Sequence, residues 1–370
     1  AFLSYSHSGV VDFVSVSTNT TVPRGTLRFP EIPRGITVIE ADPDRNQLIL
    51  VDRVSNRILM FSFTTNDWYS VADDVGEVEG ISLDAMNREL YYTRLTPPSI
   101  WRLSLSADDP ASYPVVSTRV AYLGQGNKPK DIVVHPCRML IFFTNSGNVP
   151  SIERMYYSGY RRERIVEEEV IGDTRLSIDF SAEKLYFAEI TSAKIYRVDF
   201  DGRNKEIVIP GTENRTTLLR RPYALAIVDD QLVYSNIGSY VPKLELVIAD
   251  KIDGLGERLV VETSTPVQSI TVSMKNAQKC GADACASLVC GDECRLDARG
   301  QPHCACRGER KLNADNVTCS GSEYATKTCA ENEFLCKLGD RCIPYEETCD
   351  RYPDCVHAED EDEDMCSEWC

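Results

Sequence analysis

The stretch from Leu176 to Gly202, LSIDFSAEKLYFAEITSAKIYRVDFDG, decides the fold of this chain. It holds three short runs rich in β-branched and aromatic residues, and polar turn residues separate these runs. It ends in Asp201-Gly202, a pair typical of hairpin turns, and the same pair recurs at Asp253-Gly254. The stretch therefore predicts consecutive antiparallel strands joined by tight turns.

The central run of this stretch, LYFAE from Leu185, recurs along the chain. Its counterparts are LSYSH from Leu3, LILVD from Leu48, LYYTR from Leu90, IFFTN from Ile141 and LVYSN from Leu232. The successive intervals are 45, 42, 51, 44 and 47 residues. A period of this length with about four strands per repeat is typical of a β-propeller, so six copies predict six blades. A β-sandwich with accidental spacing is the alternative.

The first copy has no strand-like run before it. We expect VQSITVSM, from Val267 to Met274, to supply the missing strand from the far end of the domain. Both ends would then share one sheet, and neither would leave an open edge. The predicted fold class is all-β, with a six-bladed propeller over residues 1–277 followed by small disulfide-rich modules.

The cysteines are distributed very unevenly. Of the 15 in the chain, only Cys137 lies within the first 279 residues, and the others fall between Cys280 and Cys370. Such density indicates small modules that bury too little core to fold without disulfides, in an oxidising compartment. Three Asn-x-Ser/Thr sequons fit a secretory route and predict N-glycosylation. They lie at Asn19, Asn214 and Asn316.

The formal net charge of -17 argues against nucleic acid as a partner and favours cationic partners or bound cations. Residues 321–370 hold 15 acidic and 4 basic residues, a net charge of 4 - 15 = -11. No apolar run approaches the roughly 18 residues that a membrane span needs. The chain begins at Ala1 without an initiator methionine or a secretory signal, so we expect a processed or excised piece.

The six central runs resemble, in degenerate form, the YWTD propeller repeat of the low-density lipoprotein receptor family. The second position of the repeat is held by Tyr5, Leu50, Tyr92, Phe143, Phe187 and Tyr234. The fourth is held by His7, Asp52, Arg94, Asn145, Glu189 and Asn236. Only Asp52 keeps the family's acid. The resemblance implies that aromatic packing survives, and that the polar network of the acid is rebuilt or missing in several blades.

The first part of the tail resembles an EGF-like module, expected over residues 278–320. Its spacing is Cys285-x4-Cys290-x3-Cys294-x9-Cys304-x-Cys306-x12-Cys319. The pairing in that family implies the disulfides Cys285–Cys294, Cys290–Cys304 and Cys306–Cys319, whereas the cysteines alone leave the pairing open. The calcium-binding variant carries an acidic triplet before its first cysteine. Residues 276–279 hold no carboxylate, so we expect no calcium in this module.

The second part of the tail is similar to the class A repeat of the same receptor family, expected over residues 325–367. Its spacing is Cys329-x6-Cys336-x5-Cys342-x6-Cys349-x5-Cys355-x10-Cys366. The resemblance implies the disulfides Cys329–Cys342, Cys336–Cys355 and Cys349–Cys366. Phe334 and Ile343 make up nearly all of its apolar core, so folding is expected to need both disulfides and a metal. Residues 368–370, ending in Cys370, read as the start of a further cysteine-rich module.

The resemblance to class A repeats also implies a calcium site, because that family uses a ligand set of oxygens that suits a hard cation. The implied ligands are the side chains of Asp350, Asp354, Asp360 and Glu361 and the carbonyls of Glu347 and Tyr352. Without a cation, four carboxylates this close would repel one another. The alternative is that the acidic run 359–364 is a solvated charged surface. Such a run does not explain why Asp350 and Asp354 keep the family's offsets from Cys349 and Cys355.

Class A repeats that bind a partner's lysine place an aromatic residue, usually Trp, two residues before the fourth cysteine. The lysine stem lies along the ring and its ammonium meets an acidic rim. Here that position is Glu347, while Tyr352 follows the fourth cysteine and Asp350 and Asp354 keep part of the rim. We therefore expect this module to have a more structural role, or neighbouring modules to bind the partner's lysine.

Cys137 and Cys280 are left as a pair once the modules and Cys370 are assigned. The family's EGF-like module folds back against the propeller near its third blade, to which Cys137 is assigned, so we predict a Cys137–Cys280 bridge. The alternative is a buried free thiol at Cys137, with Cys280 rather than Cys285 opening the EGF-like module.

No set of residues points to catalysis. The histidines are too few and too scattered for a zinc site or a triad, and we find no Gly-rich phosphate loop. They are His7, His135, His303 and His357. We predict that the chain is not an enzyme, with a six-bladed propeller hydrolase as the outlying alternative.

His357 lies among acids and is a candidate pH switch. Neighbouring carboxylates raise the proton affinity of a histidine, so His357 would charge in the endosomal range and calcium would weaken. A solvated surface histidine is the alternative. His7 and His135 are candidates for a propeller–module contact. Trp68 and Trp101 are candidates for an exposed ligand face of the propeller, and core packing is the alternative.

The order of propeller, EGF-like module and class A repeat resembles that of low-density-lipoprotein-receptor-related proteins. It implies an extracellular fragment of an endocytic receptor at the plasma membrane and in endosomes, with its membrane anchor elsewhere. Such a receptor binds basic protein or lipoprotein ligands with calcium and releases them at endosomal pH. A Wnt-type signalling co-receptor or a sorting receptor, whose propeller face reads the ligand, is the alternative. Neighbouring modules or a second copy are further possible partners.

Overall fold

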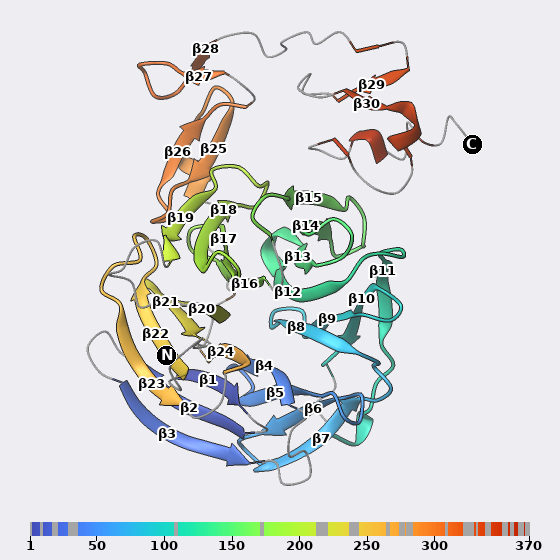
Figure 1. Ribbon diagram of the computed structural model, residues 1–370, viewed down its shortest axis with the longest axis vertical. Helices are drawn as coiled ribbons and strands as arrows, with labels where there is room; N and C mark the ends of the chain where they lie inside the picture. Colours follow the sequence, from blue (N-terminus) through green and yellow to red (C-terminus); the bar gives the residue numbers. More distant parts are fainter. Residues whose placement is uncertain are drawn as a thin grey trace.

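The computed structural model describes most of the propeller and parts of the tail. The described residues are 2–7, 10–16, 21–28, 36–106, 110–170, 174–211, 221–236, 244–263, 267–273, 278, 284–307, 310–320, 329–330, 332–336, 342–349, 354–355, 359–361 and 366. Within them, strands β1 to β24 form six four-stranded antiparallel sheets set around a central axis (Figure 1). The predicted six-bladed propeller is therefore confirmed.

Each blade runs from an inner strand near the axis to an outer strand. The first holds, in this order, β24 (Ser269–Ser273), β1 (Phe2–His7), β2 (Val10–Val16) and β3 (Thr21–Arg28). The second holds β4 (Ile36–Asp42), β5 (Gln47–Asp52), β6 (Arg57–Ser62) and β7 (Asp67–Ala72). The third holds β8 (Val78–Asp84), β9 (Glu89–Arg94), β10 (Ser99–Ser104) and β11 (Thr118–Tyr122).

The other three blades follow the same order. The fourth holds β12 (Pro129–His135), β13 (Leu140–Asn145), β14 (Ser151–Tyr156) and β15 (Glu163–Val166). The fifth holds β16 (Arg175–Asp179), β17 (Lys184–Glu189), β18 (Lys194–Asp199) and β19 (Glu206–Ile209). The sixth holds β20 (Pro222–Val228), β21 (Gln231–Asn236), β22 (Leu244–Asp250) and β23 (Arg258–Thr263).

The ring is closed by strands from its two ends. β24 pairs antiparallel with β1, and Leu3 lies opposite Val272 in this pair. This confirms that the segment from Val267 to Met274 supplies the strand missing before the first repeat. Neither end of the propeller is left as an open edge, because both lie in one sheet.

The aromatic second positions of the repeats form the core between and within the blades. Tyr92, Phe143, Phe187 and Tyr234 are each at most 1% exposed. The ring of Phe187 stacks on Tyr196 with 4.9 Å between the ring centroids. Each such side chain stabilises the fold by about 1.5–3 kcal/mol through burial alone, so the aromatic packing implied by the resemblance is present.

The polar network at the fourth position is rebuilt with different residue types. A side-chain oxygen of Asp52, Asn145 or Glu189 accepts a hydrogen bond from the N–H two residues further on, at 3.1, 3.1 and 2.9 Å. Aspartate, asparagine and glutamate thus fix the same turn in three blades, since any of these oxygens can satisfy a turn N–H.

The tail has little regular structure. The EGF-like module contains η4 (Ala284–Ser287), the hairpin of β25 (Glu293–Leu296) and β26 (Pro302–Ala305), and the pair β27 (Lys311–Leu312) and β28 (Cys319–Ser320). The class A module contains β29 (Glu333–Leu335), β30 (Cys342–Pro344), η5 (Tyr345–Glu347) and η6 (Glu359–Glu361). Its small core gathers Phe334 and Ile343 around the sulfurs of Cys336 and Cys355. None of the helices in the described ranges is long and apolar enough to cross a bilayer.

Cys137 lies one blade further along than predicted. It belongs to η2 (Pro136–Arg138), between β12 and β13, and hence to the fourth blade. The assignment to the third blade was wrong, because the repeat from Ile141 that follows Cys137 is the fourth of the six copies and forms β13 of the fourth blade.

Candidate functional site

Six disulfides cross-link the two tail modules internally. Those of the EGF-like module are Cys285–Cys294, Cys290–Cys304 and Cys306–Cys319. Those of the class A module are Cys329–Cys342, Cys336–Cys355 and Cys349–Cys366. They are the pairs that the family resemblance implies. Cys285, not Cys280, therefore begins the EGF-like set.

Cys137 is itself in a disulfide, so it is not a free thiol. Its expected partner, Cys280, lies outside the described residues. The Cys137 Sγ is 3.9 Å from the carbonyl oxygen of Gln278, two residues before Cys280. We therefore keep the Cys137–Cys280 bridge as a proposal. Peptide mapping under non-reducing conditions is expected to find these two peptides linked, and a Cys137 that is alkylated without reduction would exclude the bridge.

Asp360 organises the acidic end of the class A module. Its side chain is completely buried, and its carboxylate accepts hydrogen bonds from the N–H groups of Asp354, at 2.6 Å, and Cys355, at 3.2 Å. Its carbonyl accepts a third from the N–H of Cys349, at 3.0 Å. The structure thus brings Asp354 and Asp360 together, with Glu361 next in sequence. A buried carboxylate requires compensation of its charge, and calcium fits this set of oxygens.

The remaining predicted ligands are only partly described. Glu347 lies in η5, whereas Asp350 and Tyr352 lie outside the described residues. The candidate pH switch, His357, also lies outside them. A second group of close ligand atoms, Cys329, Glu333 and Cys342, is not a metal site. Its two sulfurs are bonded to each other and offer no thiolate.

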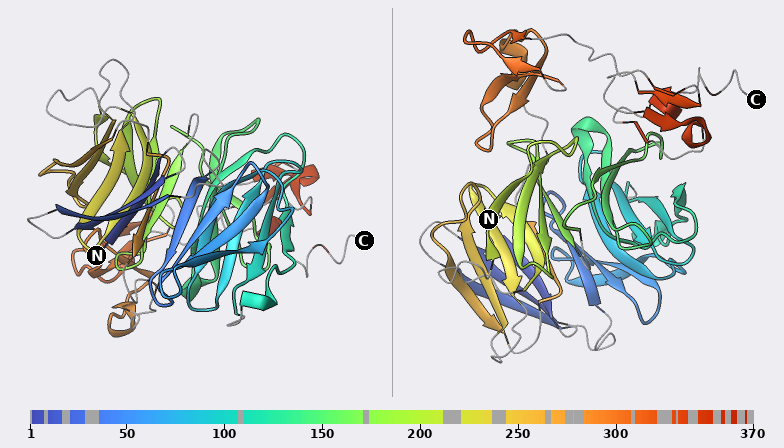
Figure 2. Two further views of the ribbon diagram at one scale, coloured as in Figure 1. Left: turned by 90° about the horizontal axis from the view of Figure 1, so that it is seen from below. Right: turned by 45° about the horizontal axis from the view of Figure 1, so that its top comes forward.

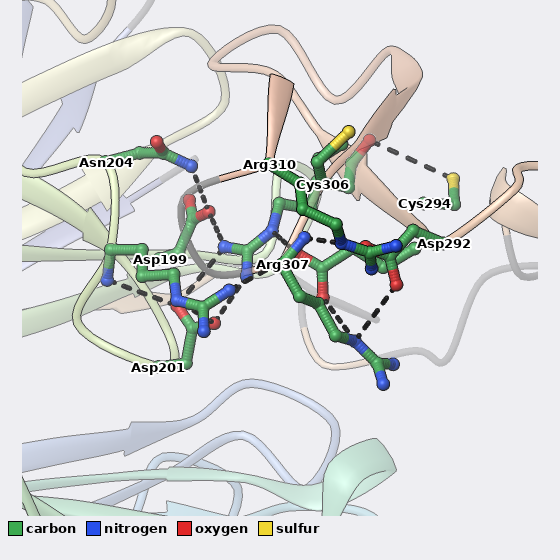
Figure 3. A network of polar contacts seen from close by, with 12 residues as sticks. Asp199, Asp201, Asn204, Asp292, Cys294, Cys306, Arg307 and Arg310 are labelled. Atoms are coloured by element: carbon green, nitrogen blue, oxygen red, sulfur yellow. Dashed lines mark hydrogen bonds and ion pairs between the residues drawn. The ribbon is translucent and has the colours of Figure 1, made fainter. Parts of the chain in front are cut away.

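Ion pairs hold the EGF-like module on the fifth blade, and Figure 3 shows Asp199 and Asp201 of the blade in this network. Arg203 of the blade lies 3.6 Å from Glu293 of the module, and Arg295 of the module makes the closest of these ion pairs. Arg295, on β25, forms ion pairs of 2.6 Å with Asp199, with Asp201 and with Glu293 of its own strand. Asp199 and Asp201 lie at the end of β18 and in the turn after it. Lys184 and Asn204 also contact Asp199, so no single cation neutralises this carboxylate. We call this set the Arg295 clamp.

Arg295 and Asp201 of the clamp stay charged over a wide pH range. Burial raises the pKa of Asp201, but the hydrogen bonds and charge of Arg295, together with those of Arg203, hold that pKa below its ordinary value. Burial likewise lowers the pKa of Arg295, while its hydrogen bonds to Asp201 and Glu293 raise that pKa above normal. The stability that Asp201 contributes is therefore lost only when the pH falls below the ordinary range of an aspartate, well under endosomal pH.

A second contact of the EGF-like module requires glycine. Gly300, at φ +74°, lies against the fifth blade, and a Cβ at this position would be 2.6 Å from the carbonyl oxygen of Ser181. The clamp and this contact were missed from the sequence, where Asp201-Gly202 reads only as a hairpin turn. No local pattern signals a partner about a hundred residues away.

The propeller axis contains a cavity of about 570 Å³ lined by the inner strands of the blades. Burial, more than repulsion by Asp131 and Asp42, raises the pKa of Glu40 in this channel to about 8. Burial also raises the pKa of Asp131, although Arg175 opposes the shift. The side chain of Gln278 lines the cavity and bonds to the backbone of β8 and of the residue after it. The linker to the EGF-like module thus contacts the channel.

The structure describes some of the other predicted residues and not others. Trp68 and Trp101 are half-buried against core clusters, which favours core packing over an exposed ligand contact for both. Asn316 is exposed in the turn between β27 and β28, while Asn19 and Asn214 lie outside the described residues. The side chain of His7 also lies outside the described set.

His135 is packed between Phe180 and Phe200, beneath the two turns that meet the EGF-like module. Its Nδ1 accepts a hydrogen bond of 3.2 Å from the N–H of Arg138. Burial, and then the charge of Arg138, lowers the pKa of His135 to about 4. An unfolded chain binds this proton more readily between pH 6.5 and 4, so acidification destabilises the folded propeller.

We expect His135→Asn to remove part of this pH dependence. Asparagine can still accept the hydrogen bond from Arg138 but does not titrate. Between pH 7 and 4.5, the free energy of unfolding of the wild type should fall by about 2–3 kcal/mol more than that of the variant. Urea unfolding at several pH values measures the difference. His303→Asn, an exposed position, is the control, and equal pH slopes in all three proteins would contradict the prediction.

Comparisons with known proteins agree with this architecture. Residues 327–366 match the family model of the low-density lipoprotein receptor domain class A. Over 286 residues the chain is 24% identical to low-density lipoprotein receptor-related protein 5 of Homo sapiens, and the match covers 76% of this chain and 16% of the relative. The chain therefore spans about a sixth of the length of this curated relative.

Solved structures show the same fold. The crystal structure of a nidogen/laminin complex matches with a TM-score of 0.62 and 16% identity, over 75% of this chain and 99% of the matched chain. TolB from Acinetobacter baumannii matches with a TM-score of 0.54 and 15% identity, over 73% of this chain and 66% of the matched chain. At these identities the likeness concerns the fold alone.

Proposed function

We propose that this chain, a member of the low-density lipoprotein receptor-related protein family, is an extracellular part of an endocytic receptor. In this proposal it binds protein or lipoprotein ligands with calcium at the cell surface and releases them at endosomal pH. The observation that carries the proposal is the class A module, in which the wholly buried Asp360 organises an acidic site. The charge of -11 over residues 321–370 favours ligands with basic surfaces.

Class A modules bind calcium, and the described residues fit the ion. Asp354, Asp360 and Glu361 would hold it with their carboxylates, and Glu347 with its carbonyl. Bound calcium would neutralise these acids and fix the fold of a module with little apolar core. Protons compete with calcium for carboxylates, so acidification would weaken the site and loosen the ligand.

The propeller has a separate role in this proposal. The Arg295 clamp and Gly300 hold the EGF-like module on the fifth blade, which makes the propeller a rigid hub. Since the ion pair of Arg295 and Asp201 stays charged at endosomal pH, release would occur at the ligand site and not by undocking of this module.

A second candidate is a signalling co-receptor or a sorting receptor whose propeller reads the ligand. The match to low-density lipoprotein receptor-related protein 5 covers 76% of this chain, far more than the class A module alone. Glu347 also stands where a lysine-gripping module has an aromatic residue. Both observations favour the propeller over the class A module as the ligand-binding surface. Binding, not catalysis, is proposed in either case, and turnover of ester or lactone substrates would contradict it.

Binding of a lysine-rich ligand tests the first proposal. The oxidised full chain is expected to bind it with calcium at pH 7.4 and to lose binding with a chelator and at pH 5.5. Surface plasmon resonance measures the three conditions. Binding that survives the chelator would place the ligand on the propeller. If the ligand binds in none of the conditions, the class A module does not capture it.

A further inference from the structure

We propose that the propeller channel is a binding pocket for a linear polyamine cation, with Glu40 as the residue that pairs with one of its ammonium groups. The channel is the cavity of about 570 Å³ between the inner strands of the blades. These strands, β4, β8, β12, β16, β20 and β24, lie around the centre of the ring in Figure 1. The left view of Figure 2 shows the strands of the blades running through the thickness of the ring. The pocket is separate from the class A module and from the ligand site proposed there.

The residues that line the channel carry a strongly negative charge. They include five acids and one base, Arg175. Two of the acids are neutralised in part, because Asp179 pairs with Lys251 at 2.7 Å and Asp131 lies 3.9 Å from Arg175. A surplus of negative charge in an enclosed site favours a cationic ligand. The acids are Glu40, Asp44, Asp131, Asp179 and Asp229.

Glu40 is a buried carboxyl group without a cation. The charged groups that act on it are Asp131 and Asp42, both acidic, and no arginine or lysine in the described ranges forms an ion pair with it. Burial, more than these acids, raises the pKa of Glu40 to about 8, so the ionised form is costly as long as nothing positive accompanies it. An ammonium group in the channel would supply that charge through a charge-assisted hydrogen bond.

The main chain of the channel wall offers acceptors more than donors. Several N–H groups of the inner strands donate to a side-chain oxygen of the preceding blade. The N–H and C=O of one residue in a strand point to the same side, so the carbonyls of these residues face the channel as well. Those of Ile39 and Leu83 bind the side chains of Ser269 and Gln278, and the others can accept hydrogen bonds from an ammonium group. The capped N–H groups belong to Ile39, Ala41, Leu83, Val134, Leu176 and Ile227.

Two of the acids stand at different depths in the channel, which favours a linear cation. Ile39 and Ile132 hold equivalent positions, because each lies opposite the second residue of its own repeat. Asp131 precedes Ile132 and Glu40 follows Ile39, so the two acids differ in level by two residues, about 7 Å along a strand. Short methylene chains separate the ammonium groups of a polyamine by a comparable length.

A bare metal ion fits this pocket less well than an organic cation. Among the described residues, no group of three close ligand atoms includes Glu40 or Asp131. The cavity is larger than a single ion needs, and Ala224, Ala226 and Ile270 make part of its wall apolar. Such a wall suits the methylene segments between the charges of a polyamine.

Calorimetric titration of the oxidised full chain with spermidine, in excess calcium, tests the proposal. Glu40→Gln removes the charge but keeps an oxygen that can accept the hydrogen bond from the N–H of Leu83. It should weaken spermidine binding about tenfold or more, because a hydrogen bond to a charged group is lost. Asp131→Asn should weaken binding less, since Arg175 already pairs with Asp131. Glu77→Gln, at an exposed acid just before β8, is the matched control and should bind as the wild type.

Two further measurements sharpen the test. Butylamine, which has a single ammonium group, should bind the wild type more weakly than spermidine does. Spermidine should raise the thermal unfolding temperature of the wild type and of Glu77→Gln, but not that of Glu40→Gln. Thermal unfolding without ligand also shows whether each variant keeps a folded propeller.

The outcomes decide between the channel and the acidic tail. A loss of spermidine affinity confined to the channel variants would support the pocket. Equal affinities in Glu40→Gln, Asp131→Asn and Glu77→Gln would overturn it, because the cation would then be held elsewhere, such as on the acidic tail. Absence of spermidine binding by the wild type would overturn it as well. None of these results bears on ligand capture by the class A module, so the two proposals fail independently.

Discussion

Replacing Arg295 with methionine is expected to release the EGF-like module from the fifth blade. The variant keeps the length and apolar contacts of the side chain but leaves Asp199, Asp201 and Glu293 without their shared cation. Removing one partner of a buried ion pair costs about 3–5 kcal/mol, because the remaining charges stay desolvated. We expect the lower end, about 3 kcal/mol, since Lys184 still neutralises Asp199 in part and Arg203 still pairs with Asp201 and Glu293.

Hydrogen exchange on the oxidised full chain measures this release. Amides of β25 and β26 and of the turn after Asp199 should exchange faster in the variant, while those of β13 should not. Arg307→Met is the control, because Arg307 is 47% exposed in its side chain and pairs only within the EGF-like module. Such exposed pairs contribute about 1 kcal/mol or less. The double variant Arg295→Met, Asp201→Asn should recover part of the loss, because it removes one uncompensated charge. Equal exchange in Arg295→Met and Arg307→Met would exclude the clamp as the holding contact.

Replacing Asp360 with asparagine is expected to remove calcium from the class A module. The change preserves the shape of the side chain but removes one negative charge and replaces one acceptor by a donor. That donor would face the N–H of Asp354 or of Cys355, and a buried unsatisfied N–H costs about 1–3 kcal/mol. Replacing a residue that only contacts a metal ligand already lowers metal affinity by about 10–100-fold. If Asp360 is a direct ligand, as we propose, its replacement should lower calcium affinity by about 100-fold or more.

Calorimetric titration of the oxidised full chain with calcium chloride tests this prediction. Glu333→Gln is the matched control. Glu333 belongs to the same module but lies beside the Cys329–Cys342 disulfide, which cannot bind a metal. Non-reducing peptide maps would show whether the three class A disulfides still form. Calcium affinity that is equal in Asp360→Asn and in the control would mean that the ion, if bound, uses other residues.

Much of the fold could be predicted from the sequence because its determinants are local. Each repeat carries its own alternation of strands and turns, and the interval near 45 residues recurs because every blade is built from the same four strands. The closure of the ring could also be predicted, because the first repeat has no inner strand of its own and requires one from another part of the chain. The cysteine spacing, read through the family resemblance, implied the six disulfides of the tail.

The tertiary structure alone decided how these parts are joined. Arg295 contacts Asp199 and Asp201, which lie 96 and 94 residues away in the sequence. Tyr160 contacts Glu361 across 201 residues of sequence. An arginine or a tyrosine in a turn looks the same in sequence whether it faces solvent or another module. The burial of His135 and the raised pKa of Glu40 arise in the same way, from neighbours on other blades. Local periodicity specifies strands and turns, whereas desolvation and charge pairing depend on which distant surfaces the closed ring brings together.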